Sequence, residues 1–114
     1  MHYDIVFHFD NGPAELNIAI SNVRNYHKAL EGESFTSVLV VNGPGIRLMG
    51  ADDPDFAEPL RELRALGLDI RVCANAMRHF GLDAAWLNPA CTVVPAGIVE
   101  LVDLQRKGYA YVKP

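Results

Sequence analysis

Five short apolar runs stand out in the pattern of hydrophobic and polar positions along the chain. They lie at residues 3–9, 35–41, 68–72, 91–94 and 109–112. Their length and their β-branched and aromatic side chains predict β-strands. The second run ends in four continuously apolar residues, Val38 to Val41. Such continuity is typical of a strand that is covered on both faces, as in a parallel sheet.

The segments between these runs have the period of amphipathic helices. Leu16, Ile20 and Val23 follow spacings of three and four residues and form the apolar stripe of the first helix. Asp53 and Pro54 predict the N-cap and the first position of the second helix. Helices are expected at residues 13–30, from Pro54 to Gly67 with a kink or restart at Pro59, at residues 74–80 and 83–87, and between Pro95 and Gly108.

The alternation of strands and helices predicts the fold class. Parallel strands that are joined by helices need right-handed crossovers, so the expected fold is a three-layer α/β/α domain on a parallel sheet. The 114 residues suit one domain of ordinary size, which spans residues 1–114. No internal repeat, low-complexity stretch or linker divides the sequence.

Composition and charge narrow the range of partners. Hydrophobic residues make up 50% of the chain and charged residues 21%, which is a globular composition. The net charge is −4, and Lys and Arg form no cluster that would displace counterions from a nucleic acid, so nucleic acid is not an expected partner. No segment is apolar for long enough to cross a bilayer, and the first residues do not have the basic start of a signal peptide. A membrane partner is therefore not expected either.

The two cysteines, Cys73 and Cys91, are too far apart in the sequence for a CxxC redox pair. They lack the Cys and His neighbours of a zinc site, and His8 and His27 have no carboxylates in ligand spacing. No metal site is therefore expected, and hydrogen-bonded positions in the core or at its rim are favoured for both histidines. Two free thiols favour a reducing compartment, and the cytoplasm is the expected location.

Candidate chemistry is expected where the strands end, because sites in open parallel α/β sheets form beyond the carboxyl ends of the strands. Three segments meet that description, at residues 8–13, 42–45 and 73–78. In the second segment, Asn42, Gly43 and Gly45 are candidate binding residues, because a glycine-rich turn can bring backbone amides close to an anion. The Gly-Lys-Ser/Thr ending of a P-loop is missing, so a tight turn is the favoured interpretation.

Cys73 stands at the expected junction of the third strand with a helix. The unsatisfied N–H groups of a first helical turn favour negative charge at this position, and a thiolate is such a charge. Arg78 and His79 are candidate cations beside it. The spacing supports a reactive thiol and a buried, inert cysteine equally. For Cys91, at the start of the fourth strand, a small apolar core residue is favoured over a resolving thiol for Cys73.

Several motifs, in this order and at this spacing, add a resemblance to a known family. HFDNGP follows the first strand, VVNGPG ends the second, VCANAMRHFG ends the third, and VVPAGIVELVDLQRKGYAYVKP closes the chain. Together these residues resemble the DsrE/DsrF-like family, which includes the small sulfur-relay proteins of the DsrEFH and TusBCD type. The last of these segments looks especially like the single-domain homomeric branch. The resemblance covers essentially the whole chain.

The resemblance implies a five-stranded parallel sheet of order 4-3-2-1-5 and a homo-oligomer, commonly a trimer or a hexamer. In relay members of the family, the cysteine at the junction of the third strand and its helix accepts sulfane sulfur as a persulfide. It then passes this sulfur on, so a sulfur donor protein and an acceptor protein are the implied partners. That position matches Cys73 in this sequence. The implied chemistry is sulfur transfer by thiolate attack, without a metal or an organic cofactor.

The residues and the resemblance together support three functional hypotheses. The leading one is a cytoplasmic sulfur carrier, similar to a sulfurtransferase, that uses Cys73. Asn75 and Arg78 would then tune or shield the persulfide, and Asn42 and Gly43 would help to form the rim of the pocket. The second is a non-catalytic binding module whose pocket, at an oligomer interface, holds a small anion or a nucleotide. The third is a structural subunit of an assembly with an incidental thiol.

Overall fold

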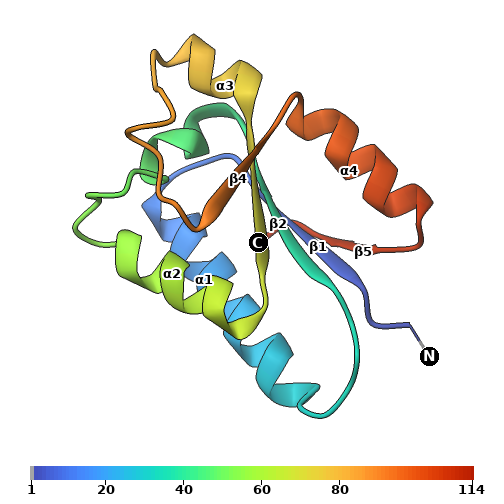
Figure 1. Cartoon of the computed structure of the whole chain (residues 1–114). Helices are drawn as coiled ribbons and strands as arrows, with labels where there is room; N and C mark the ends of the chain where they lie inside the picture. The colour runs from blue at the N-terminus through green and yellow to red at the C-terminus, as the bar shows by residue number, and fades with distance from the viewer. Residues whose placement is uncertain (1) are drawn as a thin grey trace.

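The strands expected from the sequence form a single parallel sheet in the computed structural model, which describes residues 2–114 (Figure 1). They are β1 (Ile5–Phe9), β2 (Ser37–Val41), β3 (Asp69–Cys73), β4 (Cys91–Val94) and β5 (Ala110–Val112). Their order is β4-β3-β2-β1-β5, and every neighbouring pair runs parallel. β2 is buried along its whole length, as its continuous apolar run predicts. The expected fold class and strand order are both confirmed.

The helices lie on the two faces of this sheet and at its carboxyl edge. They are α1 (Pro13–Ala29), α2 (Ala57–Leu66), α3 (Ala74–His79) and α4 (Gly97–Arg106), with a 3₁₀ helix, η1, at Gly43–Leu48. α1 and α2 contact each other on one face, whereas α4 packs against β1, β2 and β3 on the other (Figure 1). α3 and η1 contact each other where β3 and β2 end. No helix within residues 2–114 has both the length and the apolar character needed to cross a membrane.

α4 covers its face of the sheet with only a few side chains. Leu101 and Leu104 pack on valines of β1 and β2, namely Val6, Val38 and Val40. These five residues form a small second core, separate from the main one. The side of the sheet under α4 is therefore thinly covered.

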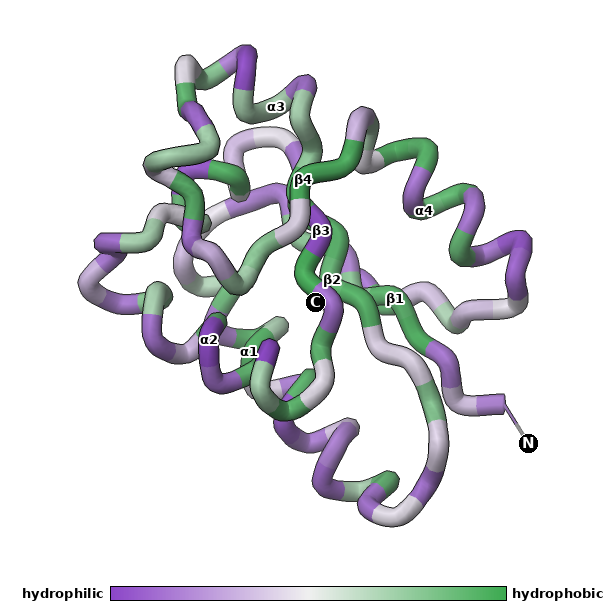
Figure 2. Tube along the Cα trace, viewed as in Figure 1, coloured by the Kyte–Doolittle hydropathy of each residue, from purple (hydrophilic) through white to green (hydrophobic). Residues whose placement is uncertain are grey.

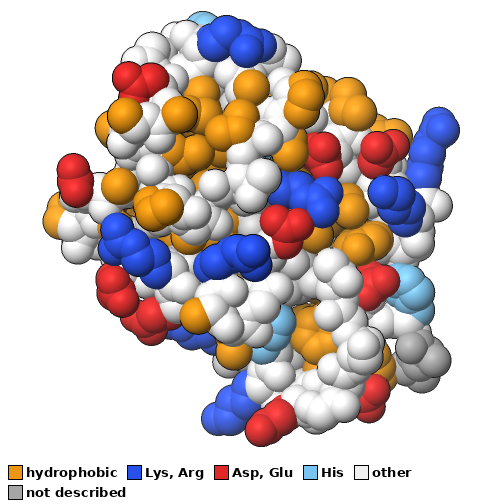
Figure 3. All heavy atoms as spheres, viewed as in Figure 1, with side chains coloured by type: hydrophobic (Ala, Val, Ile, Leu, Met, Phe, Trp, Pro, Cys, Tyr) orange, Lys and Arg blue, Asp and Glu red, His pale blue; other side chains and the backbone are white. Residues whose placement is uncertain are grey.

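The outer side of α4 remains apolar. Ile98, Val99 and Val102 are all exposed. From the sequence, Ile98 and Val102 were expected to belong to the apolar stripe of this helix together with Leu101 and Leu104. Figure 2 shows the hydrophobic character of the first half of α4. In Figure 3, hydrophobic side chains gather on the same face of the molecule, over α3, β4 and the start of α4.

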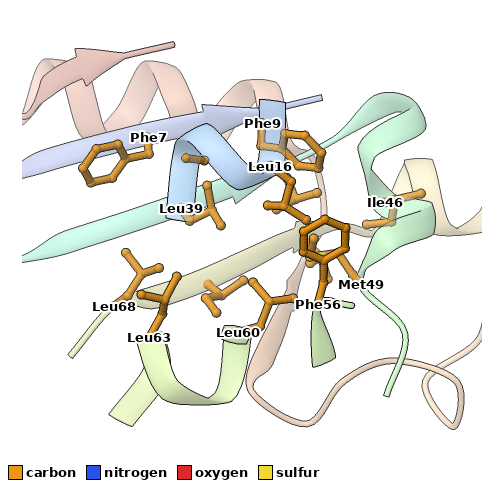
Figure 4. Packing of buried hydrophobic residues seen from close by; sticks show 14 of the residues in the cluster. Phe7, Phe9, Leu16, Leu39, Ile46, Met49, Phe56, Leu60, Leu63 and Leu68 are labelled. Atoms are coloured by element: carbon orange, nitrogen blue, oxygen red, sulfur yellow. The ribbon is translucent and has the colours of Figure 1, made fainter. Parts of the chain in front are cut away.

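The main core lies on the opposite face of the sheet, under α1 and α2 (Figure 4). Side chains of α1, α2, α3, η1 and one face of the strands meet there, whereas α4 packs on the other face, because successive residues of a strand point to opposite faces. The largest of them, all nearly inaccessible to solvent, include Phe7, Phe9, Leu16, Leu39, Met49, Leu60, Leu63 and Leu68. This core fixes the sheet and thereby the positions at which the strands end.

The second helix begins later than the sequence predicts. The Asp53 carboxylate does accept backbone N–H groups, but they belong to Asp55 (3.0 Å) and Phe56 (2.8 Å), which lie in a turn. α2 starts only at Ala57, so Pro59 falls in its first turn, where a proline N–H is not needed. The expected kink at Pro59 and the expected start at Pro54 are therefore wrong.

The short helix expected at residues 83–87 is also wrong. This segment forms a turn, in which the Asp83 carboxylate accepts the backbone N–H of Trp86 at 2.9 Å. Leu87 then forms an isolated antiparallel bridge with Gly50. An aspartate that satisfies a nearby N–H by itself offers the backbone an alternative to a helix.

Candidate functional site

A cavity of about 520 Å³ opens at the carboxyl edge of the sheet. It lies where β2 and β3 end and where η1, α3 and α4 begin, which is the position expected for a site in a parallel α/β sheet. Its walls are formed by Asn42, Gly43, Pro44, Cys73, Asn75, Ala76, His79, Phe80, Ala96, Gly97 and Ile98. Four of the six predicted site residues, Cys73, Asn42, Gly43 and Asn75, are among them.

Cys73 is the last residue of β3 and the N-cap of α3. Its backbone is still extended, with φ −76° and ψ 118°, and the helix starts at the next residue. Only 7% of the residue is exposed, and it lines the cavity. The thiol is therefore buried and also faces the cavity. The sequence alone did not decide between a buried and an accessible cysteine.

Gly97, the first residue of α4, lies directly over the cysteine. A methyl group at this glycine would lie 3.1 Å from Asn42 Cβ and 3.4 Å from Cys73 Cβ. The start of α4 thus lies so close to the sheet that a side chain at this position would require its neighbours to shift by a few tenths of an ångström. Sequence reasoning missed Gly97, although the same carboxyl-edge rule, applied to the end of β4 at Val94, points to it.

Asn42 lies beside Cys73 on the face of the sheet that α4 covers. The register pairs Val41 of β2 with Val72 of β3, so the next residues of the two strands are neighbours. The Asn42 carbonyl oxygen, Oδ1, lies 2.9 Å from Nε2 of His8. Sequence reasoning placed His8 in the core or at its rim, and the structure joins it to the wall of the cavity.

Arg78 does not line the cavity, although the sequence suggested it as a binding residue. Its side chain is exposed, and its guanidinium group donates to Oδ1 of Asn75, one turn earlier in α3. Arg78 thus contacts a cavity residue from outside. His79 and Phe80, at the end of the same helix, reach the cavity wall instead.

Of the two candidate glycines in the second segment, only Gly43 lies on the cavity. Its φ is +54°, a left-handed conformation that favours glycine. Gly45 is buried against Phe9, and a methyl group there would lie 2.7 Å from the phenylalanine ring. The glycine at position 45 is therefore explained by packing.

Cys91 lies far from Cys73 along the strand direction. It pairs with Ile70 at the start of β4, whereas Cys73 pairs with Val94 at its end. Three residues of strand span roughly 10 Å, which exceeds the reach of a disulfide. Cys91 packs against the main core, and burial raises the pKa of its thiol to about 12. These facts support the interpretation of Cys91 as a core residue.

The other side chains that were considered as metal ligands do not lie close together. His27 lies on α1 with its Nε2 atom 2.8 Å from the Ser37 hydroxyl, and burial lowers the pKa of its imidazole. Within residues 2–114, no three side chains of His, Cys, Asp or Glu come together as metal ligands would.

The protein is a small α/β protein with a parallel sheet of order β4-β3-β2-β1-β5. A cysteine ends its third strand, and a cavity lies beside this cysteine. The chain belongs to the DsrE/DsrF-like family, whose model matches residues 4–114. The family suggested by the sequence motifs is therefore confirmed.

Solved structures share this fold. One is MTH1491, a protein of unknown function from Methanobacterium thermoautotrophicum, with 31% sequence identity and a TM-score of 0.91 over 98% of this chain and 99% of that one. Another is BT1422, a conserved protein of unknown function from Bacteroides thetaiotaomicron, with 15% identity and a TM-score of 0.78 over 97% and 94% of the two chains. At that identity the second likeness shows the fold alone. A search of curated proteins finds no match.

Proposed function

We propose that this protein is a sulfur carrier that holds sulfane sulfur as a persulfide on Cys73 and passes it to a partner. One observation carries the proposal: the buried thiol opens onto a cavity of about 520 Å³ at the edge where parallel α/β sheets place their sites. The first turns of α3 and α4 both begin beside this thiol, and their free N–H groups favour negative charge. Membership of the DsrE/DsrF-like family is consistent with a sulfur-relay role.

The proposed transfer needs no oxidant or reductant. The Cys73 thiolate attacks the outer sulfur of a donor persulfide, R–S–SH, and the S–S bond of the donor breaks as the new one forms. The donor leaves as the thiolate R–S⁻. An acceptor thiolate then attacks the outer sulfur of Cys73–S–SH, which regenerates the Cys73 thiolate and yields the acceptor persulfide.

In this proposal the cavity walls shield the persulfide. Asn42, Gly43 and Asn75 surround the sulfur, while Arg78 acts from outside through its hydrogen bond to Asn75. The burial of Cys73 lowers the chance that bulk thiols remove the sulfur before the acceptor arrives.

The test is the intact mass of the protein after incubation with a cysteine desulfurase and cysteine. We expect the wild type to gain one sulfur atom that a reductant removes, and Cys73→Ser to gain none. Cys91→Ser is the matched control, and we expect it to be loaded like the wild type. If no adduct forms on the folded wild type, and Cys73 also reacts slowly with iodoacetamide, the carrier function is wrong.

We further propose that the protein acts in the cytoplasm as a homo-oligomer, a trimer or a hexamer. The support for an oligomer is the exposed apolar side of α4, formed by Ile98, Val99 and Val102, because patches of this kind often mark interfaces. Two free thiols suit a reducing compartment. Because Ile98 also lines the cavity, a neighbouring copy on α4 would lie next to the site.

A second candidate function is the binding of a small anion or a nucleotide without catalysis. The observation that favours it is the size of the cavity, which is far larger than one sulfur atom and has apolar walls from Pro44, Phe80 and Ile98. Thermal unfolding of Cys73→Ser with inorganic phosphate, thiosulfate or AMP tests it. A rise in the melting temperature that persists without the thiol supports binding, since a ligand at 100 times its Kd stabilises a protein by about 2.7 kcal/mol. No shift with any of these probes argues against it.

A further inference from the structure

The two asparagines that flank Cys73 share one feature: the carbonyl oxygen of each side-chain amide is already engaged. Asn42 Oδ1 lies 2.9 Å from His8 Nε2, and Asn75 Oδ1 accepts from the Arg78 guanidinium. Both asparagines line the cavity. An amide carries an acceptor oxygen and a donor NH₂ group, so fixing the oxygen also fixes the direction of the donor.

At Asn75 the orientation of the amide follows from the chemistry of its partner. A guanidinium group has five N–H donors and no acceptor, so only the amide oxygen can face Arg78. Asn75 and Arg78 are separated by one turn of α3, and the exposed arginine holds the oxygen on the outer side. Arg78 does not engage the NH₂ group, and Asn75 is one of the residues that line the cavity.

At Asn42 the orientation depends on which nitrogen of His8 carries the proton. His8 Nδ1 lies 2.6 Å from the Tyr111 hydroxyl, and the Asp10 carboxylate lies 3.9 Å from Nε2. The nearby carboxylate, which also pairs with Lys113, favours a proton on Nε2. Nε2–H then donates to Asn42 Oδ1, and Nδ1 accepts from the Tyr111 hydroxyl. Each of the two ring nitrogens of His8 thus has a hydrogen-bond partner of the matching kind.

The strand register gives this chain of contacts a direction. Tyr111 lies on β5, His8 on β1 and Cys73 on β3, and Asn42 directly follows β2; these four strands are consecutive in the sheet. His8 of β1 engages the Asn42 oxygen and leaves its NH₂ group without this partner, and Asn42 lies between His8 and Cys73 of β3. Only 11% of the His8 side chain is exposed, and its contact with Asn42 is partly buried, whereas its contact with Tyr111 lies at the surface.

We propose that His8 and Arg78 are positioning residues that turn the amide pair, Asn42 and Asn75, so that both NH₂ groups point into the cavity and bind a negatively charged group next to Cys73. No Asp or Glu lines this cavity among residues 2–114. The ligand class is an anion, and in the proposed carrier it is the terminal sulfur of the Cys73 persulfide. This inference deepens the proposed function, but its test does not require a persulfide.

The experiment compares two reagents that alkylate the same thiolate. Iodoacetate and iodoacetamide have the same leaving group and nearly the same size, but only iodoacetate carries a negative charge. The ratio of their rate constants at Cys73 cancels the thiolate fraction and general access to the thiol, because both reagents depend on these equally. All variants carry Cys91→Ser, so that Cys73 is the only thiol left in the sequence.

We expect His8→Leu, which cannot donate to Asn42, to lower this ratio about three- to tenfold, as the loss of one oriented hydrogen bond would. His8→Gln restores the ratio, because its terminal NH₂ can take the place of Nε2–H. Asn42→Leu lowers the ratio as His8→Leu does, and the double variant lowers it no further, because both changes remove the same donor. His8→Asn, which places no donor at the Nε2 position, replaces His8→Leu if that variant fails to fold.

An unchanged ratio in folded His8→Leu or His8→Asn overturns the inference. An equal fall in His8→Leu and His8→Gln also overturns it, since that result means His8 acts by packing alone. The desulfurase experiment is independent of these ratios. If the variants change the ratio as expected but the wild type takes up no sulfur, the anion site stands and the carrier function is wrong.

Discussion

At the scale of single residues, Gly97 controls how closely α4 approaches the thiol. We expect Gly97→Ala to lower the free energy of unfolding by about 1 kcal/mol, because the added methyl group would lie 3.1 Å from Asn42 Cβ and must push the helix or the asparagine aside. It should also slow sulfur loading of Cys73. Urea unfolding and the mass assay measure the two effects. Unchanged stability together with unchanged sulfur loading in Gly97→Ala would contradict the argument.

His27 gives the stability of the protein a dependence on pH. Burial lowers the pKa of this imidazole in the folded state below its ordinary value of 6.5, so the unfolded chain takes up a proton first as the pH falls. The stabilisation is complete above about pH 6.5 and decreases as the pH falls through that value toward the lower folded pKa. We therefore expect the urea midpoint to decrease between pH 8 and pH 5.

The variant His27→Gln can keep a hydrogen bond to Ser37 but does not titrate, so we expect a smaller decrease over the same range. His79→Gln, which changes an exposed imidazole, serves as the control. If His27→Gln and the wild type lose stability equally between pH 8 and pH 5, another group causes the dependence.

The cavity residues that could be predicted from the sequence are those that directly follow a strand, because sites in parallel sheets form beyond the carboxyl ends of the strands. Cys73, Asn42, Gly43 and Asn75 follow predicted strand ends, and the cavity brings them together. Their partners could not be found in this way. Tyr111 reaches His8 only because β5 lies next to β1, and that order came from the family resemblance rather than from any local pattern.

At the scale of elements, an ion-pair network joins β3 to α4. The Arg71 guanidinium donates to Asp69 at 3.0 Å and to Glu100 at 2.7 Å, and all three side chains are only partly exposed. The network supplements the small apolar core under α4. It therefore helps to hold the helix whose first residue lies over Cys73.

We expect Glu100→Gln to lower the free energy of unfolding by about 1–2 kcal/mol, between the values for exposed and buried pairs, because it leaves Arg71 with one carboxylate fewer. Arg24 and Glu62 form an exposed pair at 3.7 Å and supply the control: Glu62→Gln should change stability by less than about 0.5 kcal/mol. Urea unfolding measures both. Equal effects of the two substitutions would mean that the partial burial of the Arg71 network adds nothing.

The type of nearly every element could be predicted from hydrophobic period, whereas some boundaries could not. The start of α2 was misplaced because Asp53 and Pro54 favour a turn as well as a helix start. In α4 the period is helical, but it does not distinguish the side that packs on the sheet from the side that faces outward. Leu101 is buried and Val102 is exposed, although both are apolar neighbours in the sequence.

At the scale of the whole molecule, the exposed apolar side of α4 provides a test of the proposed homo-oligomer. We expect the wild type to be an oligomer by size-exclusion chromatography with light scattering, and Val99→Lys to shift it toward the monomer, because a charge in an apolar contact is unfavourable. Ile18→Lys is the matched control: Ile18 is exposed to a similar extent, 50% against 57%, but lies on α1. A monomeric wild type, or equal effects of the two lysines, would remove the proposed interface.

The strand order also has a consequence for the rate at which the chain folds. β1 pairs with β5 through residues such as Ile5 and Ala110, at opposite ends of the sequence, and the contact between His8 and Tyr111 spans 103 residues. Contacts between residues so far apart in sequence slow folding, because the loop between them must close before the contact contributes. We therefore expect refolding in milliseconds to seconds rather than microseconds. The hydrogen bonds that orient Asn42 would be completed among the last, so a partly refolded chain would have a thiol before it has a finished site.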